Sequence, residues 1–148
     1  MSREGDPRRP AGERGGEKQA QGGRILVVDD ERMVRRVTVS ILQRAGFTVL
    51  DAGNGGEGMA LAREHAGEID LLFTDLSMPD VSGLDVAAEF LRHNPGRPVI
   101  YTSGYSDVEL VSRVEKKGGI FLEKPYEVRQ LAQVVRSALA GGGSRREA

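Results

Sequence analysis

Short apolar runs recur along this chain, and four of them end at a chemically reactive side chain. Asp29-Asp30 follows the run at 25–28, and Asp75 follows the run at 71–74. Thr102 follows the run at 99–101, and Lys124-Pro125 comes after the run at 120–122. If these runs are parallel strands of one sheet, their carboxyl ends all lie at the same edge. The sequence therefore predicts that three carboxylates, a hydroxyl and an ammonium group meet in one place.

Helical periodicity separates the apolar runs. Residues 32–45 place Val34, Val37, Ile41 and Ala45 at helical spacing, and similar patterns cover 57–65, 84–91, the region of Val111 and Val114, and 128–139. A further short strand is expected at 47–50, followed by a turn at 54–56. Parallel strands need crossover connections, so the alternation predicts an α/β fold with helices on both faces of a five-stranded parallel sheet. The size fits a flavodoxin-like (βα)5 sheet, and the strand order 2-1-3-4-5 is expected partly from a family resemblance.

Composition narrows the class of protein. The 148 residues, 39% of them hydrophobic, suit one domain, and the formal net charge of -1 gives no reason to expect direct nucleic-acid binding. The chain has no cysteine and no apolar run long enough to cross a membrane, so a cytoplasmic protein without membrane insertion is expected. Residues 1–23 are rich in glycine and charge and predict a disordered tail. The folded domain is expected at 24–140, with a flexible C-terminal tail at 141–148.

With these residues in this order, the chain resembles a response-regulator receiver domain of two-component signalling. The segment 101–106, Tyr-Thr-Ser-Gly-Tyr-Ser, is similar to receivers of hybrid sensor kinases. The resemblance implies a phosphorelay protein that accepts a phosphoryl group on Asp75 and thereby switches a partner-binding surface. The donor is then a histidine kinase or a histidine phosphotransfer protein, and the downstream protein partner stays open.

Three clustered carboxylates repel one another, so a bound cation is expected to keep them ionised. Oxygen ligands of this kind suit Mg²⁺, and Mn²⁺ is a possible substitute. The resemblance assigns the metal to Asp29, Asp30 and Asp75, together with the backbone carbonyl of Ser77.

The resemblance also assigns the groups around the phosphoryl oxygens. Lys124 and Thr102 are expected to contact the phosphoryl group, although the neighbouring Ser103 carries the same chemistry. Thr102 and Phe121 are the expected switch residues, and the small residues Ser77 and Gly104 are expected to control dephosphorylation. The Lys124-Pro125 peptide bond is expected to be cis, a form that is accessible before proline.

Two other functions share parts of this pattern. An aspartyl-phosphate hydrolase of small molecules also uses an aspartate nucleophile with Mg²⁺, but such enzymes usually carry a second aspartate where Ser77 stands. A phosphorylation-independent interaction module would be expected to lack Asp75, Thr102 or Lys124. The sequence therefore favours a phosphoacceptor switch over an enzyme.

Overall fold

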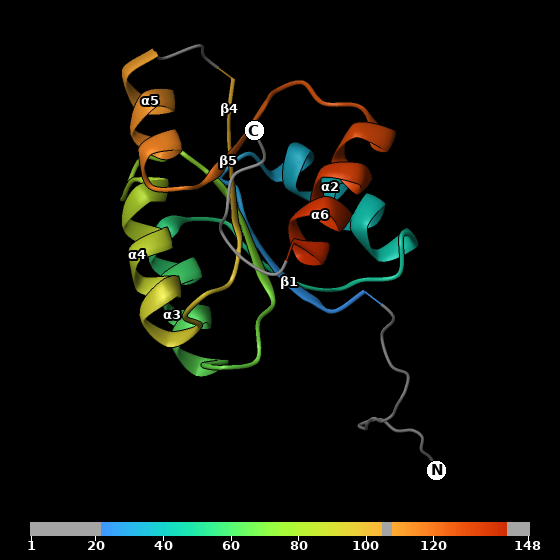
Figure 1. The fold of residues 1–148 in the computed structure, drawn as a ribbon, viewed down its shortest axis with the longest axis horizontal. Helices are drawn as coiled ribbons and strands as arrows, with labels where there is room; N and C mark the ends of the chain where they lie inside the picture. Colours follow the sequence, from blue (N-terminus) through green and yellow to red (C-terminus); the bar gives the residue numbers. More distant parts are fainter. Residues whose placement is uncertain (1–21, 105–107, 142–148) are drawn as a thin grey trace.

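The computed structural model describes residues 22–104 and 108–141 (Figure 1). The elements in chain order are β1 (Arg24–Val28), α2 (Arg32–Arg44), β2 (Thr48–Ala52), α3 (Gly55–Glu64), β3 (Leu71–Asp75), α4 (Gly83–His93), β4 (Val99–Ser103), α5 (Val108–Lys116), β5 (Ile120–Glu123) and α6 (Val128–Ala140). The expected tails fall almost entirely on 1–21 and 142–148, which lie outside the described residues.

All five strands form one parallel sheet in the order β2-β1-β3-β4-β5, as the sequence predicted. β1 and β3 are neighbours although β2 separates them in the chain, and the register pairs Val28 with Thr74. β3 in turn pairs with β4, where Asp75 lies beside Thr102. This order places the ends of β1, β3 and β4 next to one another at one edge of the sheet.

Helices cover both faces of the sheet (Figure 1). One buried cluster lies under α3, α4 and α5 and includes Ala62, Phe90 and Val114. The other lies under α2 and α6 and includes Leu42 and Leu131. Because successive residues of a strand point to opposite faces, each strand contributes to both clusters.

The buried face of α2 differs from the expected one. Thr38 and Leu42 are the fully buried residues of this helix, whereas Val37 is 55% exposed. The apolar pattern missed Thr38 because it counts threonine as polar. In the fold the Thr38 hydroxyl is hydrogen bonded to the Tyr126 hydroxyl, and this bond makes its burial tolerable.

The expected turn at 54–56 is instead the start of α3. Asn54 is the N-cap residue, and its side chain accepts a hydrogen bond of 2.8 Å from the backbone N–H of Glu57. Gly58, which weakens the sequence signal for a helix, lies against β1. A Cβ atom at Gly58 would come within 2.7 Å of a methyl group of Val28, so glycine permits the close approach of α3 to the sheet.

Among the helices in the described part of the chain, none combines the length and the hydropathy that a membrane-spanning segment needs.

Candidate functional site

Three carboxylates converge where β1 and β3 end. Asp29 and Asp30 directly follow β1, and Asp75 is the last residue of β3. One carboxylate oxygen from each of these residues lies within 4.8 Å of the other two. The convergence expected from the strand order is therefore present in the structure.

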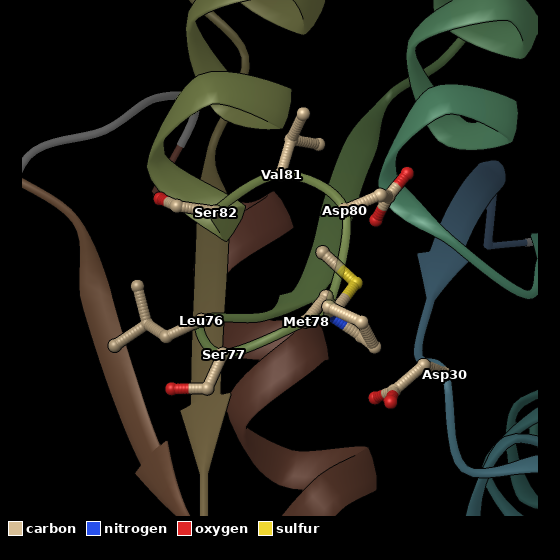
Figure 2. A pocket seen from close by; sticks show the side chains of 8 residues that line it. Asp30, Leu76, Ser77, Met78, Asp80, Val81 and Ser82 are labelled. Atoms are coloured by element: carbon tan, nitrogen blue, oxygen red, sulfur yellow. The ribbon is translucent and has the colours of Figure 1, made fainter.

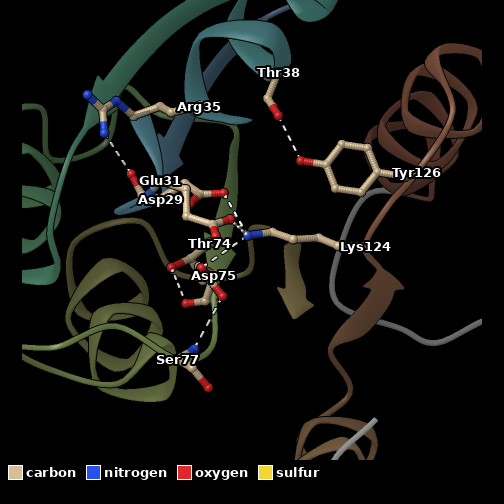
Figure 3. Close-up of polar contacts among 9 residues, drawn as sticks. All are labelled: Asp29, Glu31, Arg35, Thr38, Thr74, Asp75, Ser77, Lys124 and Tyr126. Carbon is tan, nitrogen blue, oxygen red and sulfur yellow. Dashed lines mark hydrogen bonds and ion pairs between the residues drawn. The ribbon is translucent and has the colours of Figure 1, made fainter. Parts of the chain in front are cut away.

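Lys124, directly after β5, places its ammonium group beside Asp29 and Asp75 (Figure 3). Its Nζ atom lies 3.2 Å from Oδ2 of Asp75 and 3.2 Å from Oδ2 of Asp29. The same nitrogen donates a hydrogen bond of 3.0 Å to Oε1 of Glu31. The lysine thus contacts both strand ends and also the residue that precedes α2.

Glu31 is a site residue that the sequence interpretation missed. It is the N-cap residue of α2, and its backbone N–H donates a 2.9 Å hydrogen bond to Oδ1 of Asp29. Its position directly after the Asp29-Asp30 pair was the available signal. The sequence alone did not indicate that its carboxylate would reach Lys124.

A cavity of about 320 Å³ lies at this junction. Its lining residues are Asp30, Glu31, Asp75, Ser77, Ser103, Gly104 and Lys124. A second, open cavity of about 560 Å³ adjoins it and is lined by Asp30 and residues 76–82 of the loop between β3 and α4 (Figure 2). Asp75 is itself buried and lines the first of these two cavities.

Burial dominates the electrostatics of the two innermost acids. Desolvation raises the pKa of Asp75 to about 6, although Lys124 acts in the opposite direction. Desolvation also raises the pKa of Asp29, against the hydrogen bond from Glu31 and the charge of Lys124. For Lys124, desolvation lowers the pKa, but the hydrogen bond to Glu31 and the charges of Asp29 and Asp75 outweigh it, so that the pKa is raised. The lysine therefore stays charged at neutral pH, and the acids carry repulsion that a cation would relieve.

The donor set fits a divalent cation. Asp29 Oδ2 is buried and makes no hydrogen bond with the described residues, although it lies at ion-pair distance from Lys124. A buried carboxylate oxygen without a hydrogen bond has a free lone pair for a metal, and clustered carboxylates are ligands that hard cations prefer. The three aspartates can therefore hold such an ion.

The loop after Asp75 is held close to the site. The backbone N–H of Ser77 donates a hydrogen bond of 3.3 Å to Oδ1 of Asp75, and Ser77 lines the cavity. Farther along the loop, the Asp80 carboxylate accepts hydrogen bonds of 3.0 and 2.8 Å from the backbone N–H groups of Gly55 and Gly56. These two bonds, at the N-terminus of α3, hold the pKa of Asp80 below its usual value. The sequence interpretation did not identify this contact.

Of the two hydroxyl-bearing residues at the end of β4, Ser103 lines the cavity and Thr102 does not. Thr102 is fully buried, does not line the cavity, and has a hydroxyl oxygen without a hydrogen-bond partner in the described structure. Ser103 is the last residue of β4 and lines the cavity beside Asp75 and Lys124. The preference for Thr102 therefore does not match the lining of the cavity, although Thr102 is the register partner of Asp75.

The remaining predicted residues lie as follows. Gly104 lines the cavity, and the Lys124-Pro125 peptide bond is cis, as expected. Phe121 is half-buried and packs against the cluster under α3, α4 and α5. It therefore lies on the sheet face that those helices cover, beside its register partner Tyr101.

Comparisons with known proteins agree on one family. A family model described as response regulator receiver domain matches residues 25–136. The sensor kinase CckA of Brucella abortus (strain 2308) is 34% identical over 117 residues, which are 78% of this chain and 12% of CckA. Across the curated relatives compared with it, the chain spans between 12% and 57% of their length.

Solved structures give the same result. The crystal structure of the receiver domain from the hybrid histidine kinase CckA is 36% identical, covers 79% of this chain and 99% of its own, and has a TM-score of 0.69. A response regulator receiver domain protein from Clostridium thermocellum is 30% identical, covers 80% of this chain and 95% of its own, and has a TM-score of 0.75.

The parallel sheet and the acids at its edge define a receiver of two-component phosphorelay signalling. The chain belongs to the response regulator receiver domain family.

Proposed function

We propose that Asp75 is the phosphoacceptor of this receiver and that its carboxylate attacks the phosphorus atom of a phosphohistidine. The new bond joins a carboxylate oxygen of Asp75 to phosphorus, while the phosphorus–nitrogen bond of the donor breaks and the histidine leaves. The observation that carries this proposal is that Asp75 is buried, lines the cavity and has Lys124 Nζ 3.2 Å from its Oδ2. A histidine kinase or a histidine phosphotransfer protein is the proposed donor.

The proposed metal ion is Mg²⁺, with Mn²⁺ as a substitute. Its proposed ligands are Asp29, Asp30, Asp75 and the backbone carbonyl of Ser77. The bound ion supplies positive charge that neutralises the carboxylates and the phosphoryl oxygens. The cluster of carboxylate oxygens and the unbonded Oδ2 of Asp29 support this assignment.

Lys124 and Ser103 are the proposed contacts of the phosphoryl oxygens. Lys124 already lies at ion-pair distance from Asp75, and its raised pKa keeps it charged. Ser103 takes the role first expected of Thr102 because it lines the cavity and Thr102 does not. Gly104 directly follows Ser103 in the chain. We propose that Gly104 and Ser77 are small residues of the cavity wall that control the access of water.

The switch is proposed to run from Ser103 to Phe121. Movement of Ser103 toward a phosphoryl group shifts the end of β4, and Phe121 lies on the neighbouring strand β5. A half-buried aromatic ring is able to turn inward and repack the surface around β5 and α5. This change in surface is how a downstream partner would read the phosphorylated state.

The proposed receiver unit spans 24–140, supported by the family match and by elements that run from Arg24 to Ala140. It acts as a phosphoacceptor switch that assists its own phosphorylation and dephosphorylation, and not as an enzyme with a small-molecule substrate. A cytoplasmic location is proposed because both kinds of phosphodonor present their histidine there.

Transfer from a phosphorylated histidine phosphotransfer protein tests the proposal. The wild-type chain should gain the phosphoryl group in the presence of Mg²⁺, and Asp75→Asn should gain none. Asp85→Asn is the matched control because Asp85 is an exposed acid in the first turn of α4. Equal labelling of wild type and Asp75→Asn would show that Asp75 is not the acceptor.

A further inference from the structure

Two contacts join the segment after β5 to α2 (Figure 3). Lys124 Nζ donates to the carboxylate of Glu31, at 3.0 Å. Two residues later, the hydroxyl of Tyr126 lies 2.7 Å from Oγ1 of Thr38. Glu31 and Thr38 are seven residues apart, which is about two turns of helix, so both contacts lie on the same side of α2.

The Tyr126 ring is also fixed against β3. It packs edge-on against Phe73, with ring centroids 5.8 Å apart and an interplanar angle of 85°. Phe73 lies two residues before Asp75 on the same strand, so the two side chains point to the same face of the sheet. Tyr126 therefore contacts both the helix that follows Asp29-Asp30 and the strand that ends in Asp75.

We propose that the hydrogen bond between Tyr126 and Thr38 positions the Lys124 ammonium group for phosphoryl transfer, an inference that rests on the proposed function of Asp75. A hydrogen bond is directional, so it fixes the position of the Tyr126 hydroxyl and thereby the course of residues 124–126. The packing of the aromatic ring alone does not fix this position. The backbone of Lys124 is held on its other side by the bond from its N–H to the carbonyl of Ser103, at 3.0 Å. Lys124 Nζ lies within 3.2 Å of three different carboxylates, so a small displacement changes which of them it contacts.

A purely stabilising role for this hydrogen bond makes different predictions. Tyr126→Phe keeps the ring but leaves the hydroxyl of Thr38, a residue that is 1% exposed, without its partner, so the variant should be less stable. In the double variant Thr38→Val/Tyr126→Phe both partners are apolar, and most of the stability should return. If the bond only stabilises the fold, phosphorylation should recover together with stability. If the bond positions Lys124, phosphorylation should stay slow.

The test is the initial rate at which a small phosphodonor, acetyl phosphate, labels the full chain at saturating Mg²⁺. The loss of one hydrogen bond should slow Tyr126→Phe about two- to tenfold, and the double variant by a similar factor. Thr38→Ser, which keeps a hydroxyl group, should label at close to the wild-type rate. Unfolding by denaturant, measured on the same proteins, gives the stability.

A second comparison uses Lys124→Gln as the background. Because Tyr126 acts through Lys124, Tyr126→Phe should cause no further slowing there. Equal slowing in both backgrounds, an unchanged rate in Tyr126→Phe, or recovery of the rate in the double variant would each overturn the inference. If Lys124→Gln labels too slowly to measure, the double variant decides. Failure of wild type to label with acetyl phosphate and with a phosphorylated histidine phosphotransfer protein would instead refute the proposed function.

Discussion

Lys124, directly after β5, and Asp75, at the end of β3, form an ion pair of 3.2 Å although 49 residues separate them in the chain. The pair exists because β3, β4 and β5 are consecutive parallel strands whose carboxyl ends share one edge of the sheet. The acids around the pair keep the lysine charged, and burial makes the negative charge of Asp75 unfavourable. A cation bound in the cavity would make the negative charge of Asp75 less unfavourable, and a phosphoryl group would offer Lys124 another anionic partner.

The charge on Asp75 should destabilise the fold in the absence of divalent cations. Burial raises its pKa from 3.8 to about 6, so the ionised carboxylate opposes folding above pH 6, and this effect fades as the pH falls from 6 toward 4. We expect Asp75→Asn to be more stable than wild type at pH 8 by about 2 to 3 kcal/mol, with the difference shrinking toward pH 4. Denaturant unfolding at several pH values checks this. A variant that is less stable at pH 8, or a difference independent of pH, would contradict it.

Mg²⁺ should stabilise the protein by binding only the folded state. The melting temperature of wild type is expected to rise with Mg²⁺ concentration, and Asp30→Asn should remove most of the rise. Asp85→Asn, which changes an exposed acid outside the cluster of carboxylates, serves as the control and should respond like wild type. A melting temperature that stays constant up to about 10 mM Mg²⁺, above the range of weak divalent sites, would mean that the acids do not form a metal site.

Ser103 and Thr102 make opposite predictions for the hydroxyl that contacts the phosphoryl group. Because Ser103 lines the cavity and Thr102 does not, Ser103→Ala should still be phosphorylated but should transmit little change to Phe121. Thr102→Val, which keeps the shape of a buried side chain, should transmit the change normally. Amide chemical shifts with and without phosphorylation measure the response around β5 and α6. The reverse pattern would restore the assignment to Thr102.

The contact of Asp80 with α3 should hold the loop between β3 and α4. Asp80→Ala removes both acceptors of the Gly55 and Gly56 N–H groups, so these two amides should exchange faster with solvent and the melting temperature should fall. Asp85→Ala is the control, because Asp85 is also an acid near a helix N-terminus. Unchanged exchange at Gly55 and Gly56 would show that the contact does not order this part of the protein.

The strands and the three aspartates that follow them were predictable because their signals are local, whereas the strand order was expected partly from the family resemblance. An apolar run followed by a charged residue marks a strand end, and the helical patterns between the runs require parallel strands. The choice between Thr102 and Ser103 was not predictable in this way. Thr102 is the register partner of Asp75, but Ser103, one residue farther along β4, lines the cavity, and no local pattern distinguishes the two positions.

Contacts between distant residues also escaped the sequence. Thr38 and Tyr126 are 88 residues apart, and Asp80 is 24 residues from Gly56. Each of these contacts depends on how whole elements pack, and neither residue of a pair carries a local pattern that names its partner. The burial of Thr38 was missed for this reason. An apolar pattern does not indicate that a polar residue is buried when its hydrogen-bond partner, Tyr126, lies just before α6.

Localisation of the phosphoryl group by mass spectrometry tests the role of Asp75 most directly. After treatment of the intact chain with acetyl phosphate and Mg²⁺, we expect one phosphate on the peptide that contains Asp75. It should be an acyl phosphate that base and hydroxylamine remove, and it should be absent from Asp75→Asn. An acid-stable phosphate on Ser77, Thr102 or Ser103, with Asp75 unmodified, would contradict the proposed phosphoacceptor.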